Sequence, residues 1–423
     1  MSLQKIKRIL FVVNQKPDVI GGHLISAVSL AASLVQRGYE VGVLLPKLRS
    51  YIPELHQPNL RLHEVPAVPG LQVLLFFQKI ASTVRQYQYD AIVAMDLKAI
   101  FQVVPTLLRS APLLVQVQPG GTASKRPYFK QPGILVFSEE IRHHLVSNCG
   151  IVPEHIVLST GRVNFKNYQS LPSKERALLS YREDTLRLLT ISRLVPSKVQ
   201  AINHLFDEVE EVGKSRRVDL IVIGDGEVRH SLEKRSAQIH AATQGNVAIT
   251  FLGAFRVTAN ELQQPDIVIG QGRTAVEGIA AGTPVAISGS DGYFGLIRLS
   301  NLSELISTNL TGRNIAWRGH LLDDLELLDR CKSQEFSSVQ EQMFRQFDVS
   351  QGAVAVEKAL MSLSYAYPNV TSLRRQYLRA AFSDLLPSAA VNMPRELITH
   401  LTHLIVKAGR CILNRGTEAN PRI

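Results

Sequence analysis

The sequence predicts an α/β protein built from two doubly wound parallel-sheet domains, with a helical C-terminal extension. Three observations predict this fold class. Short apolar runs alternate with helix-like stretches, a pattern typical of parallel sheets with helices on both faces. The alternation is interrupted by the polar stretch 164–183 and then restarts, and the strand-like runs stop beyond about residue 330. A chain of 423 residues is long enough for two such domains and an extension.

The first domain is predicted to span residues 1–165. Gly38 directly follows its first helix, and a glycine just beyond the last turn is a common helix end. Strands are expected at 9–13, 40–45, 60–65, 90–94, 113–117 and 133–137. Helices are expected at 23–37, 71–87, 98–108 and from Ser138 onward.

The second domain is predicted to span residues 184–330. Strands are expected at 186–191, 218–223, 247–251, 267–269 and 284–287. Helices are expected at 199–212, 227–242 and 274–281. Ligands bind beyond the carboxyl ends of the strands in such sheets, so two domains facing each other are expected to enclose a binding cleft.

The extension, 331–423, is predicted to be helical. Helices are expected at 338–347, 353–366 and 372–386, and a further one begins near Pro394. Its apolar stripe from Leu397 to Ile412 is interpreted as packed core, with a membrane-lying helix as the alternative.

Composition restricts the function classes. The chain has 45% apolar and 20% charged residues, which excludes a disordered protein. Three widely spaced cysteines exclude a disulfide framework and fit a reducing compartment. No apolar run is long enough to cross a bilayer, so we expect the protein in the cytoplasm or on the inner face of the cytoplasmic membrane. The net charge of +11 indicates an anionic partner: nucleic acid, phosphorylated small molecule or acidic lipid.

Two glycine pairs follow predicted strands and precede helices. Backbone N–H groups at Gly21 and Gly22 can approach an anion at the positive end of a helix. A tight turn without a ligand is the alternative. Gly224 and Gly226 lack the third glycine of a dinucleotide fingerprint, so a turn and helix start is favoured there.

Arg193 and Lys198 flank a short Pro-Ser loop after a predicted strand. A guanidinium fork and an ammonium point charge together suit a diphosphate, although solvated surface charges are the alternative. Glu277 follows the glycine loop 270–272 and is expected in the first turn of a helix, where the dipole favours a carboxylate. It is also able to accept two hydroxyls of a ribose. Asp96 ends a strand, and helix capping is favoured over contact with an acceptor hydroxyl.

In order and spacing, several segments together resemble the GT-B fold glycosyltransferases, specifically the GT4-like group, over about residues 5–310. They are Gly21-Gly22-His23, Leu30–Leu34 with Gly38–Val41, Phe137–Arg142, Gly161–Val163, Ser192-Arg193-Leu194 with Lys198, Gly224-Asp225-Gly226, Phe251-Leu252-Gly253, and Glu277 with Ala281–Val285.

The resemblance implies two Rossmann-like domains, the first on the acceptor side and the second holding a nucleoside-diphosphate sugar. Arg193 and Lys198 match positions that neutralise the donor diphosphate and act in catalysis, and Glu277 matches the ribose-binding carboxylate. The other expected substrate-binding residues are Gly21, Gly22, His23, Gln118, Gly224, Gly272, Arg273 and Thr274.

Two positions depart from the family pattern. The pattern has a second glutamate eight residues before Glu277, where this chain has Ile269; Gln271, Arg273 and Thr274 occupy the loop instead. A histidine often follows the fifth strand of the first domain, where this chain has Gln118. No metal or other cofactor is expected, because the resemblance implies a family that is usually metal-independent and the sequence shows no Asp-x-Asp motif.

These residues together predict a hexosyltransferase, retaining by resemblance, in surface polysaccharide or glycan biosynthesis. Its acceptor would be a glycan or a lipid-linked molecule. The alternative is a catalytically impaired GT-B protein that binds nucleotide sugars or glycans. The charge also permits a nucleic-acid binder, but the sequence shows no nucleic-acid recognition motif. The basic aromatic loop around Lys125, Arg126 and Lys130 is interpreted as solvated, with contact to an anionic acceptor or membrane as the alternative.

Overall fold

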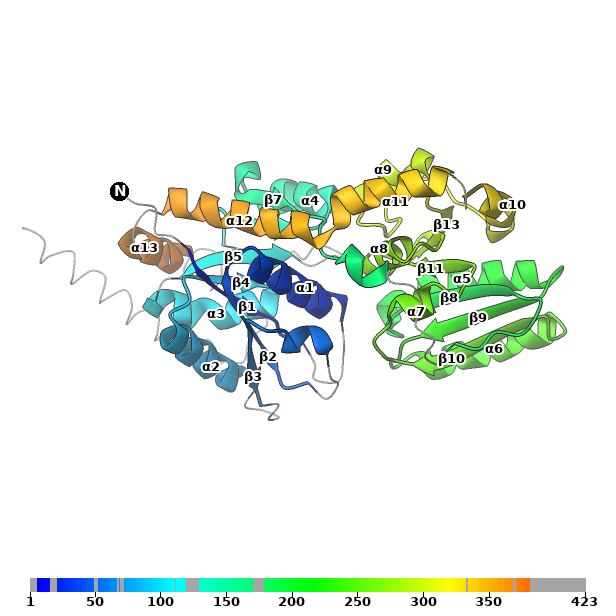
Figure 1. Cartoon of the computed structure of the whole chain (residues 1–423), viewed down its shortest axis with the longest axis horizontal. Coiled ribbons are helices and arrows are strands. Elements are labelled where there is room, and N and C mark those ends of the chain that lie inside the picture. The colour runs from blue at the N-terminus through cyan, green and yellow to red at the C-terminus, as the bar shows by residue number, and fades with distance from the viewer. Residues whose placement is uncertain are drawn as a thin grey trace, which may run out of the picture. The chain divides into compact units, whose positions relative to one another are not determined.

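The computed structural model describes residues 6–15, 21–48, 52–66, 68, 72–110, 112–118, 129–169, 179–331, 334–367 and 370–380. The chain divides into two compact units (Figure 1). Unit 1 comprises Met1–Arg162 and Ser350–Ile423, and unit 2 comprises Val163–Val349.

The sheet of unit 1 has seven strands in the order β3-β2-β1-β4-β5-β6-β7, and every described pair is parallel. The strands are β1 (Arg8–Val12), β2 (Glu40–Pro46), β3 (Leu60–Val65), β4 (Ala91–Ala94), β5 (Leu113–Gln118), β6 (Ile134–Val136) and β7 (Ile156–Leu158). Most of their residues are buried, as expected for strands covered by helices on both faces. The short strand β7 was not predicted.

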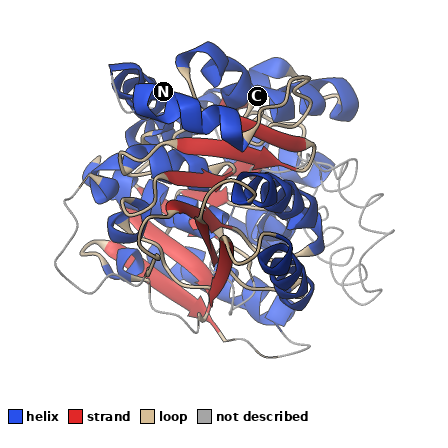
Figure 2. Cartoon of the chain, turned by 90° about the vertical axis from the view of Figure 1, so that its right-hand side faces the viewer, coloured by secondary structure: helices blue, strands red, loops and turns tan. Residues whose placement is uncertain are grey.

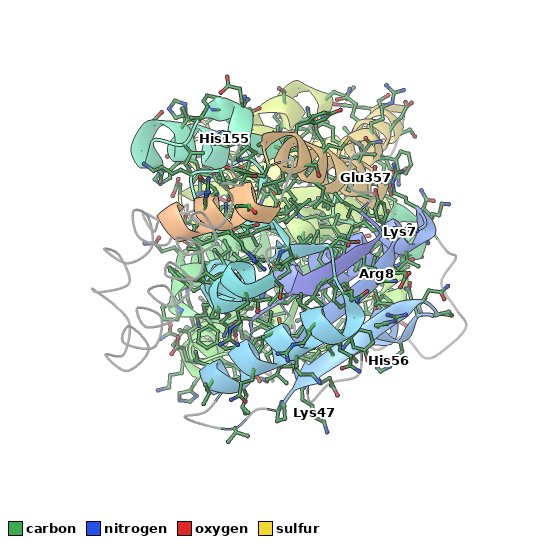
Figure 3. All side chains as sticks on the ribbon, turned by 90° about the vertical axis from the view of Figure 1, so that its left-hand side faces the viewer. Lys7, Arg8, Lys47, His56, His155 and Glu357 are labelled. Carbon is green, nitrogen blue, oxygen red and sulfur yellow. The ribbon has the colours of Figure 1, made fainter. Side chains whose placement is uncertain are left out.

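Helices cover both faces of this sheet. They are α1 (Gly22–Gln36), α2 (Gln72–Tyr87), α3 (Leu97–Ser110), α4 (Glu139–Cys149), α12 (Val349–Ala366) and α13 (Val370–Ala380). Helix α12 lies against α1, because the Arg37 guanidinium donates to both carboxylate oxygens of Glu357 at 2.9 and 2.7 Å (Glu357 is labelled in Figure 3). Gly352 in α12 touches the Gly161 carbonyl, leaving no room for a Cβ atom.

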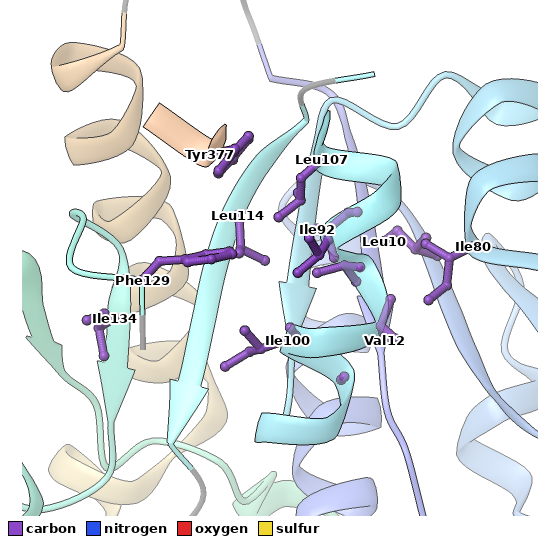
Figure 4. Packing of buried hydrophobic residues seen from close by; sticks show 14 of the residues in the cluster. Leu10, Val12, Ile80, Ile92, Ile100, Leu107, Leu114, Phe129, Ile134 and Tyr377 are labelled. Atoms are coloured by element: carbon purple, nitrogen blue, oxygen red, sulfur yellow. The ribbon is translucent and has the colours of Figure 1, made fainter. Parts of the chain in front are cut away.

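The core of unit 1 joins segments from both ends of the chain (Figure 4). Leu10, Ile92 and Leu114 come from the central strands, and Tyr377 comes from α13. The buried Tyr377 hydroxyl donates to the Pro112 carbonyl at 2.7 Å. Phe129 lies between Arg126 and Lys130, in the basic aromatic loop that was interpreted as solvated, and is instead fully buried in this core.

The sheet of unit 2 has six strands in the order β10-β9-β8-β11-β12-β13. The strands are β8 (Leu186–Ile191), β9 (Val218–Ile223), β10 (Val247–Gly253), β11 (Ile267–Gly270), β12 (Val285–Gly289) and β13 (Gly292–Leu296). Strand β13 pairs antiparallel with β12 and was not predicted, since its two glycines hide the apolar run.

Unit 2 carries helices α5 (Pro196–Gly213), α6 (Arg229–Ala242), α7 (Ala259–Leu262), α8 (Arg273–Ala280), α9 (Leu299–Ser307), α10 (Leu321–Cys331) and α11 (Gln334–Phe347). Figure 2 shows strands between layers of helices. The predicted helical extension is divided between the two units. Helix α11 belongs to unit 2, and α12 belongs to unit 1 from Ser350 onward. Helices α7, α9 and α10 were not predicted.

The chain enters and leaves unit 2 at neighbouring residues. Val163 forms a parallel bridge with Asp348. The Val163 amide donates to the Phe347 carbonyl at 3.2 Å, and the Val349 amide donates to the Val163 carbonyl at 2.9 Å. The two ends of unit 2 are therefore joined by backbone hydrogen bonds.

Several sequence predictions lie outside the described residues. They are the loop positions Lys125 and Arg126, the helix start near Pro394 and the apolar stripe from Leu397 to Ile412. Among the described residues, no helix combines the length and the apolar character that crossing a membrane requires.

Candidate functional site

The loop that follows β8 is held by the glycine turn that follows β9. Leu194 donates its amide to the Asp225 carbonyl at 3.0 Å, and Ser192 donates to the Ile223 carbonyl at 3.0 Å. A Cβ atom on Gly224 would stand 1.8 Å from the Ser192 carbonyl oxygen. Gly224 also has φ 147°, which other residues rarely adopt. The predicted turn is confirmed, and it fixes the backbone on either side of Arg193.

Lys198 is the third residue of α5, and within the described residues its side chain makes one hydrogen bond. Its Nζ donates to the Oε1 atom of Gln271 at 2.8 Å. Gln271 in turn donates through Nε2 to the Ser288 carbonyl at 2.6 Å, which fixes the orientation of the amide. Gln271, in the loop where this chain departs from the family pattern, therefore fixes the position of Lys198, the lysine predicted to bind the diphosphate.

Lys198 carries its charge in unfavourable surroundings. Burial lowers its pKa below the usual 10.5, and the positive charges of Arg193 and Arg313 lower it further. A cation in the first turn of a helix is also disfavoured by the helix dipole. Among the described residues, neither Arg193 nor Lys198 forms an ion pair with a carboxylate. At the carboxyl edge of this sheet, these two cations are thus left without a carboxylate partner within the described part of the chain.

The glycine loop after β11 ties three segments together. Gly272 precedes α8 with φ 54° and donates its amide to the Leu310 carbonyl at 3.0 Å. Thr274 donates its hydroxyl to the Ile191 carbonyl, at the end of β8, at 3.2 Å. The loop is thereby fastened both to the strand that leads to Arg193 and to the segment that contains Leu310.

Glu277 is buried and engaged by several donors. Its Oε1 accepts from the Tyr168 hydroxyl at 2.6 Å and from the Arg273 Nε atom at 2.7 Å. Arg256 Nη1 lies 3.8 Å from the same oxygen, and Arg256 Nη2 donates to the Tyr168 hydroxyl at 3.3 Å. Burial, and next the Glu277 charge, raise the pKa of Tyr168.

The predicted helix position of Glu277 was wrong. Helix α8 begins at Arg273, so Glu277 stands in the second turn rather than the first. Its charge is balanced by Arg273 one turn before it, at the i and i+4 spacing that brings side chains together on a helix. Arg273 is itself 11% exposed in its side chain, so the pair is shielded from water.

In unit 1, the predicted glycine pair stands where α1 begins. Gly21 is the N-cap residue, and Gly22 is the first helical residue and exposed. A Cβ atom on Gly21 would stand 2.9 Å from Nδ1 of His23 and 3.8 Å from Oε1 of Gln15. Gly21 has an ordinary φ of −89°, so its backbone conformation does not require a glycine, and a Cβ atom there would displace the His23 ring.

Asp96 follows β4 and caps the start of α3. Its Oδ1 accepts from the Ala99 amide, and its Oδ2 accepts from the Asn14 amide, both at 2.9 Å. Burial raises its pKa, against the opposing effect of these two amides and of the nearby His23 charge. The capping prediction is confirmed. Gln118, the predicted replacement for a histidine, is buried at the end of β5.

Neither a protein-family model nor a curated protein matches the chain. Solved structures do. HepE from Anabaena in complex with UDP shares 18% identity and a TM-score of 0.59, over 84% of this chain and 100% of that one. A glycosyltransferase from Rickettsia africae shares 16% identity and a TM-score of 0.58, over 85% and 98%. Sucrose-phosphate synthase from Thermosynechococcus elongatus shares 15% identity and a TM-score of 0.59, over 85% and 100%.

The chain has the GT-B fold. The predicted fold class of two Rossmann-like domains and the predicted helical C-terminal part are thereby confirmed. Similarity of fold does not test membership of the GT4-like subgroup or the roles of single residues. Both stay predictions.

Within its second GT-B unit, the structure brings together most of the predicted residues. Arg193, Lys198, Gly272, Thr274 and Gly224 lie on segments joined by direct hydrogen bonds. Arg273 and Glu277 form a second group on α8 with Tyr168 and Arg256. In unit 1, Gly21, Gly22 and His23 lie at the start of α1, and Gln118 is the last residue of β5.

The sequence reasoning missed Tyr168, Arg256 and Arg313. Tyr168 stands in the stretch interpreted as a linker, although its short 3-10 helix (Phe165–Tyr168) begins with an Asn164 cap that the sequence displays. Arg256 and Arg313 stand in loops without a motif. Only the long-range contacts of the folded chain reveal these three residues.

Proposed function

We propose that the chain is a glycosyltransferase that takes a sugar from a nucleoside-diphosphate sugar and passes it to a carbohydrate or lipid-linked acceptor. Three observations support the proposal: the GT-B fold, the segments that match that group, and the cations at the carboxyl edge of the second sheet. HepE, which shares the fold, has been crystallised with UDP and with UDP-glucose.

The observation that carries the proposal is the pair Arg193 and Lys198 without a carboxylate partner among the described residues. Transfer breaks the bond between the anomeric carbon and the diphosphate oxygen. The sugar then develops positive charge, as in glycoside cleavage, and the diphosphate gains negative charge. Cations fixed before the reaction stabilise that negative charge most as it forms, so they act on the transition state.

The remaining residues have assigned roles in this proposal. Glu277 accepts ribose hydroxyls, and Arg273 with Tyr168 holds its carboxylate in place. Gly21 and Gly22 approach donor phosphate through backbone N–H groups. Gln271 orients Lys198 and stands in the loop whose first glutamate the chain lacks. Gly224, Gly272 and Thr274 set the backbone of this edge, and the resemblance assigns His23 and Gln118 to substrate binding.

The finer assignment is a hexosyltransferase of the GT4-like group that moves a hexose or hexosamine with retention of anomeric configuration. It acts in surface polysaccharide or glycan assembly at the inner face of the cytoplasmic membrane, without a metal. The net charge of +11 fits attachment to an anionic membrane.

A thermal-shift screen of the full chain against UDP, GDP, ADP and their sugars tests the proposal. One nucleotide series should raise the melting temperature in a saturable way. Arg193→Ala and Glu277→Ala should each abolish the shift. Arg216→Ala removes an equal charge from an exposed position near the start of β9, at the opposite edge of the sheet, and should keep it. No shift with any nucleotide in the unmodified protein would contradict the proposal.

The second candidate function is a GT-B protein that binds nucleotide sugars or glycans without transferring them. It is favoured by Ile269 at the position of the missing glutamate and by the donors that already occupy Glu277. Release of nucleoside diphosphate from the sugar donor distinguishes the two. A transferase shows slow hydrolysis that an acceptor accelerates, whereas a binder shows saturable affinity and no release.

A further inference from the structure

The loop after α9 has an unusual backbone. Asn309, Leu310, Gly312 and Asn314 have φ values of 58°, 55°, 72° and 60°. Only Gly312 among them tolerates this region without steric cost, and a branched apolar residue such as Leu310 rarely adopts it. Such clusters persist only when their surroundings force them, and they concentrate at functional sites.

The surroundings of this loop do force its conformation. The side chain of Leu310 is fully buried, and its amide donates to the Leu305 carbonyl at 2.7 Å. The Thr311 hydroxyl donates to the Thr308 carbonyl at 2.7 Å. Gly289, at the end of β12, packs so closely that a Cβ atom there would stand 2.5 Å from the Thr311 carbonyl oxygen.

The same loop is fastened to the segment that holds Lys198. Gly272 donates its amide to the Leu310 carbonyl at 3.0 Å, and the preceding residue, Gln271, accepts from Lys198 Nζ at 2.8 Å. Arg313 follows Leu310 by three residues and is partly exposed. Its amide donates to the Thr311 hydroxyl at 3.4 Å.

We propose that Arg313 is a third cation of the anion site formed by Arg193 and Lys198, and that the loop 308–314 is shaped to place it there. The proposal rests on the proposed function for the identity of the ligand, a diphosphate group. The positive charge of Arg313 reaches Lys198 strongly enough to lower the pKa of that lysine, which supports their proximity.

Charge balance gives the physical reason for this arrangement. Three cations from separate segments repel one another, and burial of Lys198 adds to the cost. A nucleoside diphosphate brings two or more negative charges on oxygens that accept from guanidinium and ammonium groups alike. Such a ligand presents enough acceptor oxygens to be contacted by cations from three segments at once.

Titration calorimetry of the full chain with inorganic pyrophosphate and with UDP tests the proposal. We expect Arg313→Ala to weaken pyrophosphate binding 10- to 100-fold, close to the loss expected for Lys198→Ala. Arg313→Lys, which keeps the charge, should recover part of the affinity. Arg216→Ala, the matched control at the far edge of the sheet, should bind as the unmodified protein does. Thermal melting of each variant checks that it is folded, and Arg313→Met replaces the alanine variant if that one is not.

The outcomes separate the two proposals. If Lys198→Ala loses pyrophosphate and a folded Arg313→Ala or Arg313→Met keeps unmodified affinity, the third cation is wrong and the proposed function stands. If the unmodified protein binds neither pyrophosphate nor UDP, GDP or ADP, both are overturned. A loss confined to the Arg193, Lys198 and Arg313 variants supports both.

Discussion

Charged side chains stand at both edges of the unit 2 sheet, and the two edges use them differently. At the amino edge, Arg182 pairs with Asp219 at 2.6 Å and Arg187 pairs with Asp266 at 2.7 Å. At the carboxyl edge, Arg193 and Lys198 form no ion pair within the described part of the chain. Charge is balanced where the sheet only has to be stable, and is left in excess where a ligand is expected to balance it.

The guanidinium of Arg182 donates several hydrogen bonds to neighbouring acceptors. Besides Asp219, it donates to the carbonyls of Gly245, Val218 and Asn246 at 2.9, 3.0 and 2.8 Å. It joins the starts of β9 and β10 to the segment before β8. Lys198, by contrast, has one neutral acceptor, Gln271.

The largest expected effect follows from removing the excess charge. Lys198→Ala or Arg193→Ala should lower kcat for donor cleavage about 100- to 1000-fold, because each cation stabilises charge that develops on the diphosphate. Release of nucleoside diphosphate measures it, with Arg216→Ala as control. Unchanged turnover in either variant would show that the unpaired cation at that position does not act in catalysis.

Breaking the balanced edge should instead cost stability. Arg182→Ala leaves the buried Asp219 carboxylate without its charged partner and should lower the free energy of unfolding by about 3 kcal/mol. Urea denaturation of unit 2 measures this loss. Pyrophosphate affinity of the folded variant should not change, and a large loss of affinity would show that the two edges are coupled.

The Glu277 cluster is intermediate, since it lies at the carboxyl edge and is internally paired. Tyr168→Phe removes one hydroxyl donor from a buried carboxylate and should cost about 2 kcal/mol of stability. It should weaken UDP binding more than pyrophosphate binding, because the lost hydroxyl orients the ribose contact. Equal weakening of both ligands would argue against that role for Glu277.

The smallest expected effect is a pH dependence. The folded protein binds the Lys198 proton less tightly than the unfolded chain, whose lysine titrates near 10.5. The cost of the buried charge is therefore present below the lowered pKa, and stability rises as the pH increases toward 10.5. The stability of the unmodified protein minus that of Lys198→Met should therefore increase as the pH is raised from 8 to 10.5. A flat or falling difference would contradict the burial of this charge.

Local patterns were sufficient for most of the fold and for half of the site. The strands of both sheets read directly as apolar runs, and Arg193 and Lys198 stand next to a strand end that the sequence displays. Contacts between residues that are distant in sequence could not be predicted from local patterns. Tyr168 meets Glu277 across 109 residues, and nothing local marks either Arg256 or Arg313. Strand β13 was missed because Gly292 and Gly295 interrupt its apolar run.

The bridge between Val163 and Asp348 has a consequence for protein engineering. Since unit 2 starts and finishes at hydrogen-bonded neighbours, residues 163–349 form one continuous polypeptide with adjacent ends. Such a segment is suited to excision as a separate gene product, or to having its ends fused and new ones opened elsewhere. Isolated in this way, it would present the basic sheet edge and the Glu277 group for spectroscopy on a chain less than half as long.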